Sequence, residues 1–330
     1  MRVLTRSDVE RAISMREAVE IVIQAFVELS TGKADVPLRV TLPQAKHDGV
    51  TLFMPAYLSD SESLAVKAVS VHDRNAERNL PRIHAIVVVI DPATGQPVAA
   101  MEGGYLTALR TGAATGAATE LLARKDAEVA AVIGAGVQAR AQILAVAAAR
   151  PIKRCWIYAR HREKINALIA EVQPQLGSSV ELLAAESPSQ AVREAQVVCA
   201  ATTSSTPVFN GEDLQAGAHV NGVGSYKPEM QEIDSATLKR ASKIVVDSRE
   251  AALAEAGDLI VAIERGEIQI EDIYGEIGEI AAGLKPGRED DSEITYFKSV
   301  GNAAQDAAVA QAIYQRALKD ELGVEIDLYT

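Results

Sequence analysis

The chain has 330 residues, a formal net charge of -12 and 4% aromatic residues, so aliphatic side chains must fill its core. This length suits two domains better than one. The acidic balance argues against nucleic acid as a partner, because phosphate binding needs a concentrated basic surface. No run approaches the roughly 18 apolar residues of a membrane span, and no signal-peptide core is seen, so we expect a cytoplasmic protein without a membrane partner. Cys155 and Cys199 lie in apolar runs and are expected to be buried, inert thiols.

The first third of the chain mixes two periodicities. Residues 14–30 carry apolar side chains at helical spacing. Strand-like runs follow at 36–42, 50–53, 64–71 and 85–90, and a turn at 92–95. These elements predict an α+β block.

From about residue 111 the pattern becomes an alternation of helices and strands. Helices are predicted at 111–122, 137–149 and 161–171, and strands at 128–133, 154–158, 180–183, 197–201, 220–223 and 243–247. This alternation predicts an α/β Rossmann domain, a doubly wound parallel sheet with helices on both faces. A last helix at 303–322 is expected to leave this domain and pack on the first block.

A glycine turn joins the first of these strands to its helix. The strand ends at Gly134-Ala135-Gly136, and Val137 and Gln138 open the helix. Such glycines let the backbone turn tightly and approach a pyrophosphate, whose charge the helix N-terminus favours. Ala139 keeps the third position of the motif small. Because the strand, the turn, the helix and the second strand follow one another in the order and spacing of a βαβ unit, we predict a dinucleotide site.

The end of the second strand bears on the choice of cofactor. An acidic residue there would bind the ribose 2′-hydroxyl of NAD. This chain instead has Ala159, Arg160 and Arg162, and guanidinium groups suit the 2′-phosphate of NADP(H). We predict that NADP(H) is preferred and that NAD(H) remains possible. The alternative is that both arginines are ordinary solvated charges.

Three cations of the first block stand outside charge runs. Lys67 lies inside an apolar strand, where a lysine needs a partner or a pocket. Arg110 is expected at the start of a helix, and Arg39 lies earlier in the chain. Two arginines and a lysine suit a small carboxylate substrate, with Lys67 available for proton transfer if its pKa is lowered.

Five segments of the chain are distinctive: FMPAY at 53–57, DPATG at 91–95, LTALRTGAA at 106–114, GAGVQA at 134–139 and SVGNAAQD at 299–306. Together they resemble the ornithine cyclodeaminase/mu-crystallin family over nearly the whole chain. The resemblance implies an enzyme that uses NAD(P) with an α-amino or imino acid, in a homodimer built by the non-Rossmann domain.

The resemblance also implies roles for single residues. Arg39, Lys67 and Arg110 match carboxylate-binding and catalytic positions, Val300 matches a substrate contact, and Ser299 lies beside the nicotinamide. Further cofactor contacts are implied at Thr111, Thr202, Thr203, Val220, Asn221 and Gly222.

The chain departs from the family's cyclodeaminases at two positions. Tyr226 stands where they have an Asp, and Leu52 where they have a Glu. Free ornithine needs a carboxylate for its second ammonium, and its cyclisation needs a base. The departures therefore favour imine reduction over deamination. Tyr226 either packs or donates a hydrogen bond to the substrate nitrogen as a catalytic group.

Three other candidate site residues can each be interpreted in two ways. Arg82 either contacts a cofactor phosphate, where relatives have a small hydroxyl residue, or is a surface charge. His72 lies in a surface loop or at a pocket mouth, and Asp306 caps the last helix or serves the active site. Residues 101–105 are expected to form a turn. No cluster has metal-ligand spacing, so no metal is predicted.

These observations predict NADPH-dependent reduction of a small imino acid. The first candidates are the cyclic ketimines 1-pyrroline-2-carboxylate and 1-piperideine-2-carboxylate. Alternatives are alanine dehydrogenase, then ornithine cyclodeaminase, then a non-catalytic ligand binder. Residues 1–112 with 305–330 would form the substrate and dimerisation domain, and 113–304 the Rossmann domain.

Overall fold

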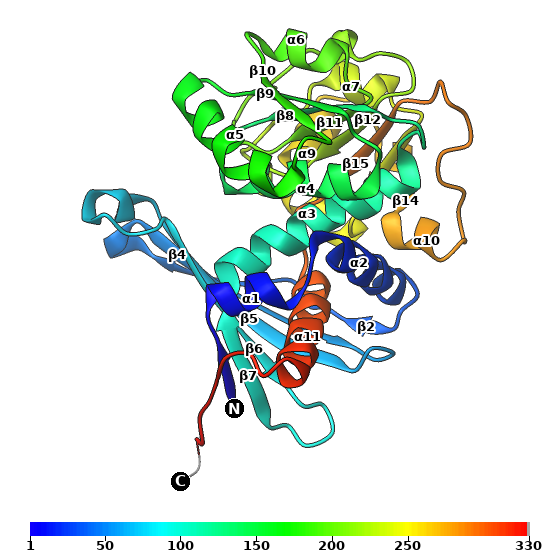
Figure 1. Cartoon of the computed structure of the whole chain (residues 1–330). Coiled ribbons are helices and arrows are strands. Elements are labelled where there is room, and N and C mark those ends of the chain that lie inside the picture. Colours follow the sequence, from blue (N-terminus) through cyan, green and yellow to red (C-terminus); the bar gives the residue numbers. More distant parts are fainter. Residues whose placement is uncertain (329–330) are drawn as a thin grey trace. The chain divides into compact units, whose positions relative to one another are not determined.

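The computed structural model describes residues 1–328, which divide into two compact units (Figure 1). The first unit comprises Met1–Arg110 and the chain from Asn302 onward, and the second comprises Thr111–Gly301. The first unit is therefore built from two segments separated by the whole second unit.

The first unit contains one mixed sheet. Its strands run in the order β16-β1-β7-β6-β5-β4-β2, with β3 also paired to β4. All pairs are antiparallel except β1 with β7. The strands are β1 (Arg2–Leu4), β2 (Ala34–Asp35), β3 (Val40–Gln44), β4 (Gly49–Leu58), β5 (Ser63–His72), β6 (Ile83–Ile90), β7 (Pro97–Glu102) and β16 (Val324–Glu325).

Helices cover one face of this sheet. Helix α11 (Ala303–Lys319) packs on β4, β5, β6 and on α2 (Met15–Ser30) (Figure 1). The predicted helix at 14–30 is confirmed, and Ser14 is its N-cap, in a capping box with Glu17. The remaining helices of this unit are α1 (Arg6–Ala12), η1 (Ala45–His47), η2 (Asp73–Arg78) and the first part of α3 (Gly103–Leu122).

Burial alternates along the central strands of this sheet. On β5, Ala65, Lys67 and Val69 are buried, whereas Val66 and Ala68 are partly exposed. Period-two alternation means that one face is covered and the other is not. The middle of the uncovered face is nonetheless apolar, since Val66, Ala68 and Ile86 lie there.

The second unit holds an all-parallel sheet, as predicted. Its strand order is β10-β9-β8-β11-β12-β15-β13-β14. Alternate residues of β8 enter two separate cores, Val132 on one face and Ile133 on the other. The strands are β8 (Val129–Ile133), β9 (Arg154–Tyr158), β10 (Glu181–Ala184), β11 (Val197–Ala200), β12 (His219–Gly222), β13 (Lys243–Val246), β14 (Ile273–Glu276) and β15 (Thr295–Lys298).

Short helices connect these strands. They are α4 (Val137–Ala149), α5 (Arg162–Leu176), α6 (Pro188–Arg193), η3 (Gly211–Asp213), α7 (Ser235–Arg240), α8 (Arg249–Glu255), α9 (Gly257–Glu264), η4 (Ile270–Asp272) and α10 (Ile277–Ala281). The predicted helix at 137–149 and strand at 154–158 are confirmed. Cys155 and Cys199 are buried and free, and burial raises the pKa of both thiols, as expected of inert cysteines.

Three expectations about elements were wrong. The parallel sheet continues past 243–247, because β15 inserts between β12 and β13, and β14 forms the edge. The strand expected at 36–42 begins only at Val40, because residues 36–39, which include Pro37, lie between β2 and β3. Residues 101–105 form no turn: β7 ends at Glu102, whose carboxylate accepts from the N–H groups of Gly104 and Tyr105 at the start of α3.

No helix among residues 1–328 combines the length and the apolar character needed to cross a bilayer.

Candidate active site

Lys67 occupies the middle of β5 on the covered face of the first sheet. Its side chain is 2% exposed, and Nζ donates to Asp306 Oδ2 at 2.6 Å. The pKa of Lys67 is lowered to about 8. Burial is the main cause, the Asp306 carboxylate opposes it, and the positive charges of Arg110 and Arg39 add to the lowering. A lysine with this pKa exchanges a proton near neutral pH.

Asp306 joins two cations at the start of α11. Its Oδ1 accepts from Arg110 Nε at 3.0 Å, while Oδ2 faces Lys67. The carboxylate is 1% exposed. Asn302, not Asp306, caps the helix, because its Oδ1 accepts from the Gln305 N–H. The structure thus places Asp306 with the predicted catalytic cations, and helix capping does not explain it.

Arg110 does not open a helix, contrary to expectation. It is the eighth residue of α3, because the Glu102 carboxylate starts that helix at Gly103. Arg110 is held instead by side chains of α11, since its Nη1 donates to Gln305 Oε1 at 2.9 Å in addition to the bond to Asp306. Arg39 is half-buried before β3, and its charge acts on Lys67.

Buried amide groups complete this cluster. Asn302 Nδ2 and Gln305 Nε2 have no hydrogen-bond partner within residues 1–328, although both side chains are buried. A buried, unpartnered N–H is costly, and a bound anion would satisfy it. Neither residue was predicted from the sequence as a site residue. Both lie in the segment 299–306, and its resemblance to the family could have pointed to them.

The glycine turn of the second unit has the geometry of a phosphate site. Gly134 has φ of +125°, and a Cβ there would lie 2.5 Å from the Ala201 carbonyl oxygen, so only glycine fits. Gly136 precedes α4 as its N-cap without a side-chain cap, and a Cβ there would meet nothing within 4 Å. Val137 is 72% exposed at this helix start, and Gln138 follows it, partly buried. Uncapped N–H groups facing open space fit a pyrophosphate.

The two arginines after β9 differ in their partners. Arg162 donates to Glu186 and to the Ala184 carbonyl. Arg160 is exposed and forms no side-chain hydrogen bond or ion pair within residues 1–328. Ala159 precedes it, half-buried. Arg160 is therefore the guanidinium that remains available to a 2′-phosphate.

A buried carboxylate, missed by the sequence analysis, holds two loops at the carboxyl ends of β11 and β12. Glu232 Oε1 accepts from the N–H and hydroxyl of Thr202, at 2.5 and 2.8 Å. Oε2 accepts from the N–H groups of Gly224 and Ser225, at 2.6 and 2.9 Å. Asp258 in turn accepts from the Glu232 N–H. Glu232 thereby fixes both loops.

A second buried carboxylate fixes the segment after β15. Asp247 Oδ2 accepts from the Ser299 hydroxyl at 2.7 Å and from the N–H groups of Val300 and Gly301. Ser299 and Val300, expected beside the nicotinamide and the substrate, are thus rigidly held in the second unit. No sequence pattern pointed to Asp247, because it follows β13 and lies about fifty residues before Ser299.

The other residues expected to contact the cofactor differ in their burial. Val220 and Asn221 are buried in β12, and the Asn221 amide bonds to His219 and Thr119. Gly222 ends β12, Thr203 is exposed, and Thr111 is buried in α3. Their cofactor contacts stay predictions.

Tyr226 belongs to the second unit and Arg82 to the first. The Tyr226 ring packs against the core of the second unit, with the Lys227 ammonium 5.9 Å from its centroid. Arg82 is exposed in the first unit and bonds to Asp73. Within residues 1–328 no three His, Cys, Asp or Glu side chains are grouped to hold a metal ion.

Comparison with known proteins gives one family. The model of the ornithine cyclodeaminase/mu-crystallin family matches residues 1–321. The Delta(1)-pyrroline-2-carboxylate reductase of Bacillus cereus is 40% identical, over 99% of this chain and 100% of its own.

Solved structures agree along the whole chain. The Thermococcus litoralis Delta(1)-pyrroline-2-carboxylate reductase in complex with NADH and L-proline is 44% identical, with a TM-score of 0.94 over 99% of this chain and 100% of that chain. An archaeal alanine dehydrogenase dimer with bound NAD is 37% identical, with a TM-score of 0.91 over 100% of this chain and 99% of that one. The chain therefore belongs to the ornithine cyclodeaminase/mu-crystallin family, as an oxidoreductase that uses a nicotinamide cofactor.

Proposed function

We propose that this protein reduces the C=N bond of a small imino acid, with NADPH as the preferred reductant. A cyclic ketimine, 1-pyrroline-2-carboxylate or 1-piperideine-2-carboxylate, is the favoured substrate. The observation that carries the proposal is the buried cluster in which Lys67 and Arg110 share the single carboxylate of Asp306.

The charges of this cluster suit an anionic substrate. Lys67, Arg110 and Arg39 bring three positive charges against one carboxylate, so the cluster retains positive charge. Arg39 and Arg110 bind the substrate carboxylate, with the Asn302 and Gln305 amides as further donors. Such an anion offsets the cost of burying these groups.

Lys67 supplies the proton of the reaction. Its ammonium protonates the imine nitrogen, and with its pKa near 8 it does so readily at neutral pH. The nicotinamide cofactor supplies the hydride, which adds to the C=N carbon, so the products are an amino acid and oxidised cofactor. Lys67 then regains its proton from solvent.

The choice of a cyclic imine rests on the relatives and on two residues. The Bacillus cereus and Thermococcus litoralis relatives are both named Delta(1)-pyrroline-2-carboxylate reductases, and the second was solved with L-proline. Leu52 and Tyr226 stand where cyclodeaminases have acids, which argues against ornithine as the substrate. Tyr226 is proposed as a hydrogen-bond donor to the substrate nitrogen, and Val300 as a substrate contact.

The preference for NADPH rests on Arg160. Its side chain forms no bond within residues 1–328, and β9 ends in no acidic residue, so a 2′-phosphate gains a partner there. The solved relatives hold NADH and NAD, so the preference is proposed for this chain's own residues.

We also propose a homodimer formed by the uncovered sheet face. Val40, Phe53, Ala68 and Ile86 stand opposite one another across β3, β4, β5 and β6, and Phe53 and Ile86 are 37% and 47% exposed. An exposed apolar row of this kind marks a protein interface. The archaeal alanine dehydrogenase, described as a dimer, supports a second copy as the partner. The first unit would thus carry both substrate groups and dimer contacts.

One experiment tests the function. NADPH and NADH oxidation are followed with both cyclic ketimines and with pyruvate plus ammonia, and ornithine is assayed for proline formation. The proposal expects the highest kcat/KM with a cyclic ketimine. The highest value with pyruvate and ammonia would make the protein an alanine dehydrogenase, which the archaeal structure keeps as second candidate. Proline from ornithine, or cofactor binding without turnover, would also reject the proposal.

A matched pair of variants ties turnover to the cluster. Lys67→Ala is expected to lower kcat by about a hundredfold or more, the usual scale for a lost general acid. Lys33→Ala removes an exposed lysine of the same unit, paired with Asp60, and should leave kcat unchanged. Near-normal turnover in Lys67→Ala would remove Lys67 from the mechanism.

A further inference from the structure

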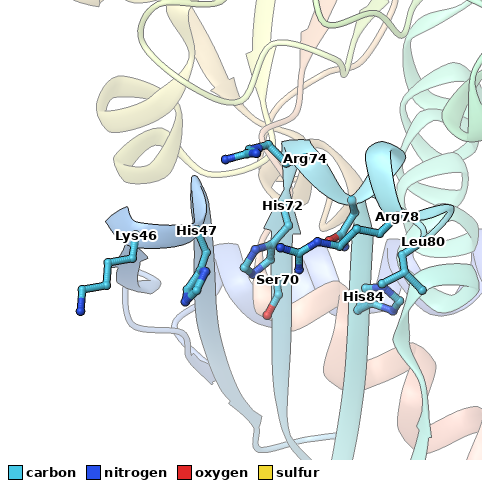
Figure 2. Close-up of a pocket in the computed structure, with 9 residues that line it drawn as sticks. Lys46, His47, Ser70, His72, Arg74, Arg78, Leu80 and His84 are labelled. Atoms are coloured by element: carbon cyan, nitrogen blue, oxygen red, sulfur yellow. The ribbon is translucent and has the colours of Figure 1, made fainter.

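The molecule has further groups of charged side chains. One lines the basic pocket of the first unit, which includes His72 and Arg78 (Figure 2). His72 lies on the same face of β5 as Ala68, the face proposed above as the homodimer interface, so a second copy of the chain would cover this pocket. Another group is the buried ion pair of Lys298 with Asp258, which lies inside the second unit of a single chain.

Lys298 and Asp258 compensate each other's charge in the interior of the second unit. Lys298 is the last residue of β15, and its Nζ donates to Asp258 Oδ2 at 2.7 Å. Both side chains are 0% exposed. The hydroxyl of Tyr296, two residues earlier on β15, donates to the same oxygen at 3.4 Å. Removal of either charge would leave the other buried without a partner, which is strongly unfavourable.

The second oxygen of Asp258 holds the backbone at Glu232. Asp258 Oδ1 accepts from the N–H groups of Glu232 and Ile233, at 2.6 and 3.0 Å. Glu232 is the carboxylate that fixes the loop after β11 through Thr202 and the loop after β12 through Gly224. Asp258 therefore anchors the backbone from which this carboxylate reaches both loops.

The loop after β11 lies against the glycine turn. A Cβ on Gly134 would lie 2.5 Å from the Ala201 carbonyl oxygen and 3.5 Å from Thr202 Cγ2, so the turn and the loop are in contact. Both follow the carboxyl ends of parallel strands, where dinucleotides bind. A displacement of Thr202 would therefore reach the part of the turn that approaches the cofactor.

Lys298 also acts on Glu232 through its charge. Burial raises the pKa of Glu232, the ammonium of Lys298 lowers it, and the Asp258 carboxylate raises it again. Only an ionised carboxylate accepts on both oxygens, as the four bonds to Glu232 require. Burial likewise raises the pKa of Asp247, and Lys298 is among the groups that lower it. One ammonium thus supports three buried carboxylates.

We propose that Lys298 and Asp258 are positioning residues for the nicotinamide cofactor, acting through Glu232. Lys298 keeps the Asp258 carboxylate in place, Asp258 anchors Glu232, and Glu232 holds the Thr202 loop against the glycine turn. Without the ammonium, the uncompensated carboxylate of Asp258 moves toward water and releases the two N–H groups that it holds. This inference needs a nicotinamide cofactor but does not depend on the proposed substrate.

Titration of each purified protein with NADPH and with NADH, followed by cofactor fluorescence, tests the proposal without turnover. Lys298→Met should raise both dissociation constants about tenfold or more, the scale of lost charge-assisted hydrogen bonds. Failure of the reductase proposal would leave this expectation intact.

Lys243→Met is the matched control. Lys243 is also a buried lysine, 5% exposed and paired with Glu289 and Glu293, but it begins β13, whereas Lys298 ends the neighbouring strand. Lys243→Met should lower the melting temperature, as Lys298→Met does, and leave both dissociation constants unchanged. Unchanged constants in Lys298→Met, or an equal rise in both variants, would overturn the proposal.

A double variant separates charge from packing. In Lys298→Met/Asp258→Asn, the amide oxygen can still accept from Glu232 and Ile233, and this pair leaves no buried charge without a partner. Both dissociation constants should return to near the wild-type values. A loss of about tenfold in the double variant, whether or not Lys298→Met folds, would overturn the proposal, because the lysine would then act by packing.

The pH dependence of Lys298→Met gives a second readout. The place of the ammonium at Asp258 Oδ2 becomes free for a proton, whereas each oxygen of Glu232 already accepts two hydrogen bonds. Protonation removes the uncompensated charge and leaves Oδ1 to accept. The dissociation constant of the variant, divided by that of the wild type, should therefore fall from about pH 9 to about pH 6. A constant or rising ratio would contradict the charge mechanism.

Discussion

Lys67 Nζ and Asp306 Oδ2 lie 2.6 Å apart although 239 residues separate them in sequence. One comes from the middle of a strand and the other from the first turn of a helix, and both are buried. This pairing keeps a lysine charged at the centre of the first unit, with a pKa of about 8. Because Asp306 also holds Arg110, it connects the proposed proton donor to a proposed anion-binding group.

The pKa of Lys67 predicts the pH dependence of the reaction. Reduction needs the ammonium form, so kcat/KM for imine reduction should fall as pH rises through about 8. Oxidation of the amino acid needs the neutral amine, so its kcat/KM should rise through the same pH. Initial rates in both directions check this expectation. A flat profile from about pH 6.5 to 9.5 in both directions would exclude Lys67 as the titrating group.

Asp306→Asn should move this midpoint to lower pH. The Asp306 carboxylate raises the pKa of Lys67, so its neutral replacement leaves burial and the two arginines to lower that pKa further. The pH profile of kcat/KM measures the shift. Asp320→Asn, an exposed change at the end of the same helix, is the control and should leave the midpoint in place. A shift of the midpoint to higher pH in Asp306→Asn would contradict this prediction.

Arg160→Asp should reverse the cofactor preference. The new carboxylate repels a 2′-phosphate and can accept from a 2′-hydroxyl, so the NADPH to NADH ratio of kcat/KM should fall by about ten- to a hundredfold. Arg154→Asp makes the same charge change at the start of β9, where Arg154 pairs with Glu194, and should leave the ratio unchanged. If the wild type uses both cofactors equally and Arg160→Asp does too, Arg160 has no part in the choice.

Phe53→Lys and Ile86→Lys should each give monomers. A lysine on the apolar row places a charge in the proposed interface, where it has no partner. Light scattering should report twice the 35.0 kDa chain mass for the wild type and 35.0 kDa for these variants. Ile270→Lys, at an exposed position of the second unit, is the control. A wild-type monomer would reject the proposed homodimer.

Glu232→Gln should weaken cofactor binding more than it slows the chemical step. The amide replaces one acceptor oxygen by a donor that faces backbone N–H groups, so the loop with Thr202 or the loop with Gly224 is released. We expect the KM for NADPH to rise about tenfold with a smaller change in kcat. Glu229→Gln, exposed in the same segment, should change neither. A loss of about tenfold in kcat with an unchanged KM for NADPH would contradict a positioning role.

Local features of this protein could be predicted from its sequence. Strand β8, the turn at Gly134 and helix α4 follow one another directly, and each carries its own residue signature. The Lys67 strand was likewise predictable from its apolar neighbours.

Features that depend on distant partners could not be predicted. Arg110 was expected at a helix start because the helix was predicted to begin at residue 111, yet the Glu102 carboxylate begins α3 at Gly103. Strand β15 carries Lys298, whose charge is compensated by Asp258 of α9, forty residues away. Asp306 resembled a helix cap until its contacts with Lys67 and Arg110 were known.

The discontinuous first unit has a consequence for synthesis of the chain. Lys67 and Arg110 are translated before the second unit, and Asp306 follows it, because the first unit resumes only at Asn302. A ribosome-bound chain that ends before Asn302 contains Lys67 and Arg110 but not yet Asp306, the carboxylate that both of them contact. The Lys67 cluster therefore forms late, after the second unit has been made, and the last helix supplies the final piece of the proposed active site.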